Sequence, residues 1–166
     1  MKISYQAIAK IKDFEGFSKK AYKCPAGVWT VGYGHTKGVK PNDVVTTVEA
    51  EHLLKKDLEL YEAFVNKLCV AENQGQFDAL VDFCFNLGCS ALERSTLLKK
   101  IKNGCSEAEI RQEFGRWCML MGRDCQDWWQ DENGRLTDSL VRHDEGIQIN
   151  RVVSRCGGDI AFCGVL

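Results

Sequence analysis

The chain has 166 residues, which is enough for one domain with a buried core. Hydrophobic residues make up 45% and charged residues 27%, close to ordinary globular usage, so neither disorder nor a fibrous architecture is indicated. The formal net charge of -1 predicts no nucleic-acid binding and no long-range attraction to an anionic polymer. No apolar run reaches the roughly 18 residues of a membrane span, so we expect no membrane insertion.

The first segment predicts an amphipathic helix that ends near Glu15. Ser4 can cap its N-terminus, and its apolar residues recur at spacings of three and four: Ile3, Ala7, Ile8, Ile11 and Phe14. Between Tyr22 and Val45, short apolar or β-branched stretches are cut by glycine and proline. This texture predicts a small sheet with tight turns.

Helices are predicted for most of the remaining chain. Thr46 and Glu49 form a capping box that opens a long helix over 46–68. Shorter helices are expected at 76–87, at 95–102, from a second capping box at Ser106 and Glu109, and at 146–155. Residues 122–145, which include Trp128 and Trp129, are expected to form an ordered surface excursion. One helix, a small sheet and then several helices indicate the α+β class.

The cysteine count is high and odd, since nine cysteines leave at least one unpaired in a monomer. No two form a C-x-x-C pair and the chain has three histidines, so we expect no metal site. Most cysteines are interpreted as small buried apolar residues, as is usual in a cytoplasmic protein. Pairing of Cys118 with Cys125, or of Cys156 with Cys163, stays open.

The stretch FEGFSKKAYKCPAGVWTVGYGHT, residues 14–36, carries the chemistry. It places a carboxylate at the end of a helix, just before a hairpin-like segment. Such an arrangement can hold a proton donor and a water-activating group apart. Glycosidic cleavage requires this separation. Glu15 is followed after eight residues by Cys24 and after five more by Thr30. This spacing resembles the active-site signature of the phage-type lysozymes, glycoside hydrolase family 24, which accepts Asp or Cys at the second position. The later stretches TTVEAEHLLKKDL, QFDALVDFCFNLG and STLLKKI resemble helices of the same family.

The resemblance implies a lysozyme-like α+β fold in a single domain over 1–166. A sheet lobe would cover about 15–45 and a connecting helix 46–70. A helical lobe would contain 71–166 together with the N-terminal helix, and the active-site cleft would lie between the lobes.

The resemblance also implies the roles of the site residues. Glu15 would be the general acid, which must hold a proton at the working pH, and Thr30 would orient the attacking water. Cys24 stands where other members carry Asp, and a largely neutral thiol lacks the carboxylate charge, so its part in the step stays open. Arg151, within an Asn-Arg pair, would support Glu15 through a bidentate ion pair. Three further residues are expected to bind substrate: Gly34, His35 and Asn86.

By this resemblance the chain would be an endolysin, a muramidase that cleaves the β-1,4 bond between N-acetylmuramic acid and N-acetylglucosamine with inversion. Its partner would be bacterial peptidoglycan, and no cofactor is expected. Charges interrupt the apolar core that a signal peptide would need, so we expect the chain to accumulate in the host cytoplasm. The resemblance also implies a monomer. A holin would then open the inner membrane and give access to the wall.

Three other readings of the same residues stay open. The chain could be a wall-binding module that has lost catalysis, although intact Glu15 and Thr30 argue against decay. It could be a cysteine hydrolase of peptide cross-links that uses Cys24 with His35. It could also be a lytic transglycosylase, which would use Glu15 without an activated water and leave anhydro ends.

Overall fold

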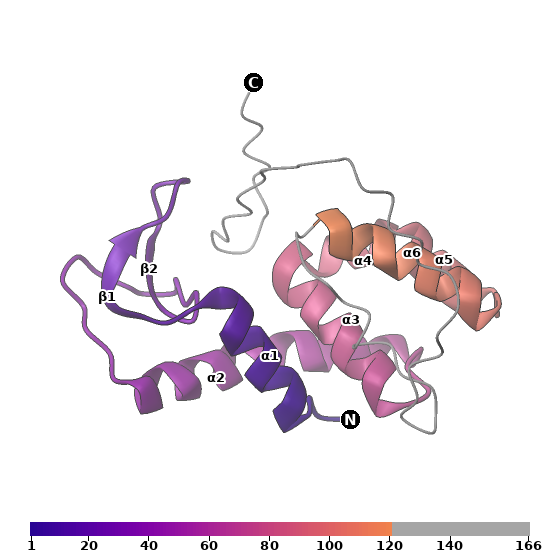
Figure 1. Cartoon of the computed structure of the whole chain (residues 1–166), viewed down its shortest axis with the longest axis horizontal. Helices are drawn as coiled ribbons and strands as arrows, with labels where there is room; N and C mark the ends of the chain where they lie inside the picture. Colours follow the sequence, from indigo (N-terminus) through magenta and orange to yellow (C-terminus); the bar gives the residue numbers. More distant parts are fainter. Residues whose placement is uncertain (121–166) are drawn as a thin grey trace.

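The computed structural model describes residues 1–120, which form two strands and six helices (Figure 1). In chain order they are α1 (Tyr5–Glu15), β1 (Ser18–Lys23), β2 (Trp29–Gly32), α2 (Thr47–Leu68), α3 (Gln74–Leu87), α4 (Cys89–Arg94), α5 (Thr96–Lys102) and α6 (Glu107–Leu120). The strands lie at one end of the molecule and α3 to α6 at the other, with α2 running between them (Figure 1). This mostly helical fold with a small antiparallel sheet confirms the predicted α+β class.

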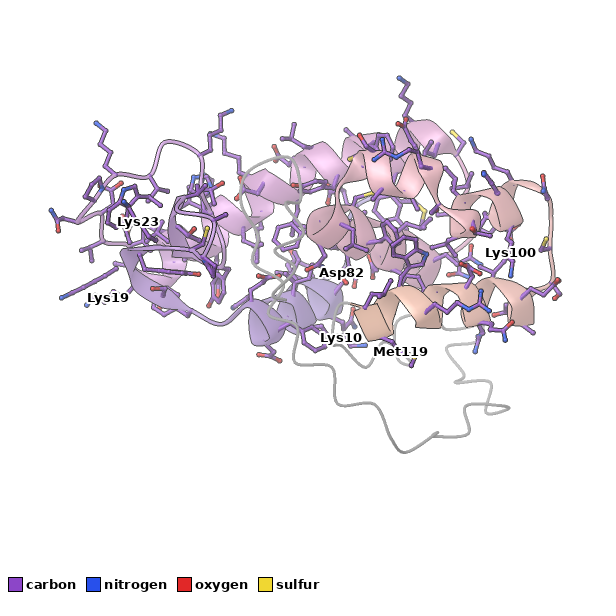
Figure 2. All side chains as sticks on the ribbon, turned by 90° about the horizontal axis from the view of Figure 1, so that it is seen from above. Lys10, Lys19, Lys23, Asp82, Lys100 and Met119 are labelled. Atoms are coloured by element: carbon purple, nitrogen blue, oxygen red, sulfur yellow. The ribbon has the colours of Figure 1, made fainter. Side chains whose placement is uncertain are left out.

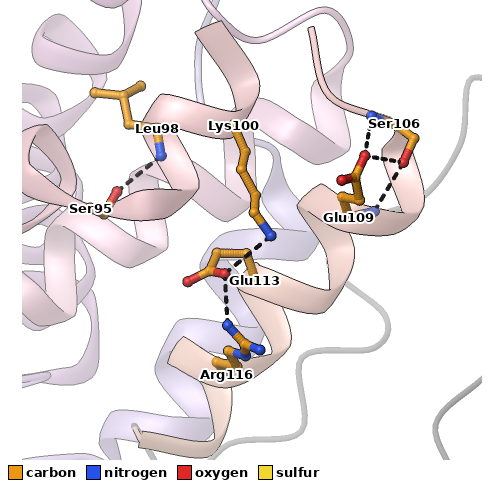
Figure 3. A network of polar contacts seen from close by, with 7 residues as sticks. All are labelled: Ser95, Leu98, Lys100, Ser106, Glu109, Glu113 and Arg116. Atoms are coloured by element: carbon orange, nitrogen blue, oxygen red, sulfur yellow. Dashed lines mark hydrogen bonds and ion pairs between the residues drawn. The ribbon is translucent and has the colours of Figure 1, made fainter. Parts of the chain in front are cut away.

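The predicted helix caps are present. The side chain of Ser4 accepts a hydrogen bond from the Ala7 N–H at 3.1 Å at the start of α1. At the start of α2, the Thr46 N–H donates to Glu49 Oε2 at 2.7 Å, and the Glu49 N–H donates to Thr46 Oγ1 at 3.2 Å. Reciprocal bonds of this kind satisfy N–H groups that have no partner inside the helix. A matching exchange between Ser106 and Glu109 opens α6 (Figure 3).

The sheet is small and begins earlier than expected. β1 pairs antiparallel with β2, with Tyr22 opposite Thr30 and Lys23 opposite Trp29. On its other edge β1 meets residues 43–45, because the Ala21 N–H donates to the Asp43 carbonyl and the Val45 N–H to the Lys19 carbonyl. The texture of the sequence predicted the start of this region at Tyr22. The strand starts at Ser18 because these backbone bonds hold a polar stretch that has no apolar alternation.

One hydrophobic core joins the elements. Every residue from 77 to 87 of α3 is buried, and α3 packs against a stripe of α2 that includes Leu54, Leu58 and Val65. Ala7 and Ile11 of α1 enter the same core, and Tyr33 extends it toward the sheet. Burial of this apolar surface is the main stabilising term of such a domain.

The buried carboxylate of Glu113 is paired with cationic side chains. Glu113 of α6 is 6% exposed, and its Oε2 atom accepts from Arg116 at 3.1 Å and lies 3.4 Å from the Nζ atom of Lys100 on α5 (Figure 3). A buried carboxylate needs such partners to offset its desolvation. The ion pair between Lys100 and Glu113 therefore fixes α5 against α6.

Two sets of expectations differ from the structure or lie outside it. Helix α4 was not predicted: it follows Gly88 directly, has no side-chain cap and spans only six residues. The excursion 122–145 with Trp128 and Trp129, the helix 146–155 and Arg151 lie outside the described residues. Within residues 1–120, no helix is long and apolar enough to cross a membrane.

Candidate active site

Glu15 occupies the last position of α1 and is half-buried. The helix stops there because Gly16 takes a φ of 68° and its N–H closes on the Lys12 carbonyl at 3.0 Å. A left-handed φ of this kind is readily available only to glycine. The end of the helix thus fixes the backbone that carries the carboxylate.

The turn after β2 brings Gly34 against Glu15. Gly34 has a φ of 89°, and a Cβ atom built on it would lie 3.5 Å from Glu15 Oε2. Val31 and His35 exchange backbone hydrogen bonds of 2.9 and 3.0 Å, which hold this turn closed. A Cβ atom at position 34 would therefore be in van der Waals contact with the Glu15 carboxylate.

Cys24 and Thr30 belong to one face of the hairpin. Thr30 is opposite Tyr22 in the register, and side chains alternate between faces, so Cys24 lies on the same face as Thr30. The Cys24 N–H extends the ladder to the Val28 carbonyl at 2.9 Å. Both side chains are buried, with exposed fractions of 6% for Cys24 and 2% for Thr30.

The two side chains differ in what they offer chemically. The Thr30 hydroxyl donates to the Val28 carbonyl at 3.3 Å, so its oxygen keeps the capacity to accept a hydrogen bond. Cys24 takes part in a disulfide, as does Cys118, whereas four other described cysteines carry free thiols: Cys69, Cys84, Cys89 and Cys105. Of these four, only Cys84 is fully buried, so the expectation of mostly buried apolar cysteines holds for part of the set.

His35 is held at both ring nitrogens. Its Nδ1 atom lies 2.7 Å from Asp57 Oδ2 on α2, and its Nε2 atom lies 2.9 Å from the Lys37 carbonyl oxygen. Both ring nitrogens are therefore engaged by partners other than Cys24. This geometry argues against a cysteine hydrolase that uses His35 as the base for Cys24. Asp57, a partner 22 positions away from His35, carries no local sequence signal and was not predicted.

Asn86 lies on the helical side, near the end of α3. It is 8% exposed, and its Nδ2 atom donates to the carbonyl and the side chain of Asp82 at 2.8 and 2.9 Å. The amide donor is thus engaged within the helix. Within residues 1–120, no group of three or more His, Cys, Asp or Glu side chains is arranged to hold a metal ion.

Comparisons with known proteins identify the family. The phage lysozyme family model matches residues 12–145. The chain is 41% identical over 118 residues to an endolysin of Acyrthosiphon pisum secondary endosymbiont phage 1, a match that covers 70% of this chain and 80% of that one. It is 42% identical over 121 residues to an endolysin of Bacillus phage PZA, covering 70% of this chain and 46% of the relative.

Solved structures give the same result. The muramidase domain of SpmX from Asticaccaulis excentricus superposes with a TM-score of 0.65 at 39% identity, covering 70% of this chain and 79% of that domain. A P22 lysozyme mutant superposes with a TM-score of 0.58 at 33% identity, covering 72% and 83%. The protein belongs to the phage lysozyme family, and the relatives that it resembles include endolysins and a muramidase domain.

Proposed function

We propose that the protein is a muramidase that hydrolyses the β-1,4 bond between N-acetylmuramic acid and N-acetylglucosamine in peptidoglycan, with Glu15 as general acid. The observation that carries the proposal is the half-buried Glu15 carboxylate, 3.5 Å from the Cβ position of Gly34, inside the Glu-Cys-Thr spacing. Membership of the phage lysozyme family supports a glycoside hydrolase, and a structural neighbour is a muramidase domain.

In the proposed reaction, Glu15 protonates the departing glycosidic oxygen while water attacks the sugar from the opposite face. The attacking water releases a proton to solvent once the new C–O bond forms, and Glu15 regains its proton from solvent. The Thr30 oxygen, whose own proton is directed at Val28, accepts a hydrogen bond from that water and orients it. Attack opposite the leaving group inverts the anomeric centre. Gly34, His35 and Asn86 are proposed to contact substrate, and Arg151 to support the acid through a bidentate ion pair.

The first test is mass spectrometry of fragments that the chain releases from purified peptidoglycan. Wild type is expected to release disaccharide-peptides with reducing ends, and Glu15→Gln to release none, because the amide cannot supply the proton. Asp13→Asn is the matched control: it removes an exposed carboxylate from the same helix and should leave release unchanged.

Each other product would contradict the proposal in its own way. Anhydro ends would assign a lytic transglycosylase, and cleaved peptide bonds would assign an amidase or peptidase. Equal release by Glu15→Gln and wild type would remove Glu15 from the chemistry. Binding without any release would assign a wall-binding module.

Cys24 has a separate test, because Asp stands at this position in other members of the family. Cys24→Asp is expected to keep much of the wild-type rate, and Cys24→Ala to lose less than Glu15→Gln does. Because Cys24 takes part in a disulfide, the wild type should be assayed both with and without a reductant, whereas Cys24→Asp should respond less to it. An inactive but folded Cys24→Asp would show that the two residues are not interchangeable here.

The proposed setting is that of a phage endolysin. The protein would act as a monomer, accumulate in the host cytoplasm and reach the wall after a holin opens the inner membrane. Peptidoglycan as the partner follows from the family, in which the relatives are endolysins. The division into a sheet lobe over about 15–45, a connecting helix over 46–70 and a helical lobe belongs to the same proposal.

A further inference from the structure

The net charge of the whole chain conceals an uneven distribution. The sheet segment, defined here as residues 18–45, contains five basic residues and one acidic residue, for a net charge of +4. The rest of the chain then holds 17 of the 22 basic and 22 of the 23 acidic residues, for a net charge of -5. The expectation of no attraction to anionic polymers rests on the net charge of the whole chain, which does not describe this segment.

The lysines of the sheet segment are exposed and free of ion pairs. Among the described residues, ion pairs engage Lys2, Lys12 and Lys100, but none of the five lysines of the sheet segment: Lys19, Lys20, Lys23, Lys37 and Lys40. The single acidic residue, Asp43, accepts instead from the Lys40 backbone N–H at 2.7 Å. The positive charge of the segment is therefore not cancelled locally.

The fold arranges part of this charge along a line. Lys19, Lys20 and Lys23 belong to β1, which is held on both edges by β2 and by residues 43–45. Lys19 and Lys23 lie at the end of the molecule opposite Lys100 (Figure 2). An extended strand rises about 3.3 Å per residue, so these two lysines are about 13 Å apart along β1, comparable with the Debye length of about 10 Å in 0.1 M salt.

Aromatic side chains lie among the lysines. The Lys23 ammonium lies 5.5 Å from the centre of the ring of Trp29, its partner in the register, and Tyr22, 47% exposed, is the preceding residue of β1 on the other face of the strand. Rings of this kind pack against the C–H groups of sugars and polyols. Ammonium groups spaced along one strand, with an aromatic ring beside one of them, fit a linear chain in which phosphates alternate with polyols.

We propose that the sheet segment is a docking surface for a phosphodiester-linked polyol polymer attached to the bacterial wall. The wall as its setting rests on the proposed function, whereas binding of the isolated polymer requires no catalysis. Charge dominates this surface: five lysines stand beside two strongly exposed apolar side chains, Tyr22 and Val44, so an anionic membrane is the less suitable partner.

The test measures binding of the full chain to purified poly(glycerol phosphate) over a range of salt concentrations. K19Q/K20Q/K23Q removes the three charges of β1. K67Q/K99Q/K102Q is the matched control, because it removes three exposed charges from α2 and α5 and changes the net charge equally. K19R/K20R/K23R keeps the charges, and circular dichroism checks that every variant folds.

Wild type, the control and the arginine variant are expected to bind alike, with an affinity that falls as salt rises. K19Q/K20Q/K23Q should bind about tenfold more weakly at low salt, as expected for the loss of three exposed contacts. Its slope of log affinity against log salt should be smaller by about 2. The Glu15→Gln variant, which keeps all the lysines of the sheet segment, should also sediment with walls that retain the polymer. It should sediment less with walls from which hydrofluoric acid has removed the polymer.

Three outcomes would overturn the proposal. Equal weakening by both glutamine variants would reduce the effect to net charge, and no weakening by either would remove the lysines of β1 from binding. Tighter binding to phosphatidylglycerol vesicles than to the polymer would assign the surface to a membrane. A failure of the muramidase assay is separate, because it leaves the binding difference between the variants unchanged.

Discussion

Gly32 shows at the residue scale how one position sets the distance between the sheet and α2. A Cβ atom at Gly32 would lie 2.9 Å from the Cβ atom of Ala50, which is 1% exposed, and the φ of Gly32 is 65°. The backbone of β2 can approach α2 this closely only without a side chain. Gly32 therefore serves packing, whereas Gly34, two positions later, lies beside the carboxylate of Glu15.

Gly32→Ala should lower the free energy of unfolding more than Gly38→Ala does. Gly38 has a φ of 76° with open space around it, so alanine there meets only backbone strain of about 1–2 kcal/mol. At Gly32 the clash with Ala50 adds a further loss of about 1–3 kcal/mol. Urea unfolding of both variants measures the difference, and equal losses would mean that the sheet moves away from α2 without cost.

The site residues divide by the kind of signal that they carry in the sequence. Glu15, Cys24 and Thr30 were named from a motif, and the structure sets Cys24 and Thr30 on one face of the hairpin. Asp57 could not be named, because its contact with His35 depends on where α2 passes the sheet. A contact between elements has no periodicity or spacing from which to infer it.

At the element scale, prediction succeeded where local chemistry determines structure. Both capping boxes follow from hydroxyl and carboxylate side chains three positions apart, and both form. Prediction failed for α4 and for the start of β1, since neither a six-residue helix after Gly88 nor the polar stretch at Ser18 has a regular apolar pattern. Tertiary backbone bonds and packing decide such elements.

The capping box of α2 predicts a pH dependence of stability. Hydrogen bonds from the Thr46 backbone and side chain hold the pKa of Glu49 below its ordinary value of 4.5. A carboxyl whose pKa is lower in the folded state stabilises the fold above its unfolded-state pKa, and this contribution disappears as the pH falls through the folded-state value. Glu49→Gln should therefore unfold with a weaker dependence on pH than wild type below about pH 4.5.

Urea unfolding at several pH values between about 3 and 6 measures this difference. Glu59→Gln is the control, because Glu59 is an exposed residue of the same helix outside the capping box. Wild type and Glu49→Gln should converge toward acid pH, while Glu59→Gln follows wild type throughout. Parallel curves for wild type and Glu49→Gln would contradict the role of the cap.

At the scale of the whole molecule, the core is unevenly shared between the two ends. Residues 77–87 of α3 are all buried, whereas no residue of β1 is buried. The sheet region is held to the helices by a few specific contacts: Tyr33 in the core, Gly32 against Ala50, His35 with Asp57, and the Lys12 ammonium of α1 over the Tyr33 ring. Regions with little buried apolar surface open at a lower free energy than the core does, so the sheet should open before α3.

Hydrogen exchange of Asp57→Asn tests how the sheet region is attached. Loss of the carboxylate weakens the bond that anchors His35 and the turn over 32–38 to α2. A hydrogen bond to a charged group contributes about 1.5–3 kcal/mol, and the 31% exposure of the Asp57 side chain reduces this to about 1 kcal/mol. Amides of the turn that exchange by local opening should therefore exchange about fivefold faster, while those of α3 keep their wild-type rates.

Glu59→Gln, with the same change in charge on the same helix, should leave both regions unchanged. Equal acceleration in the turn and in α3 would instead mean that the two ends of the molecule open as one cooperative unit.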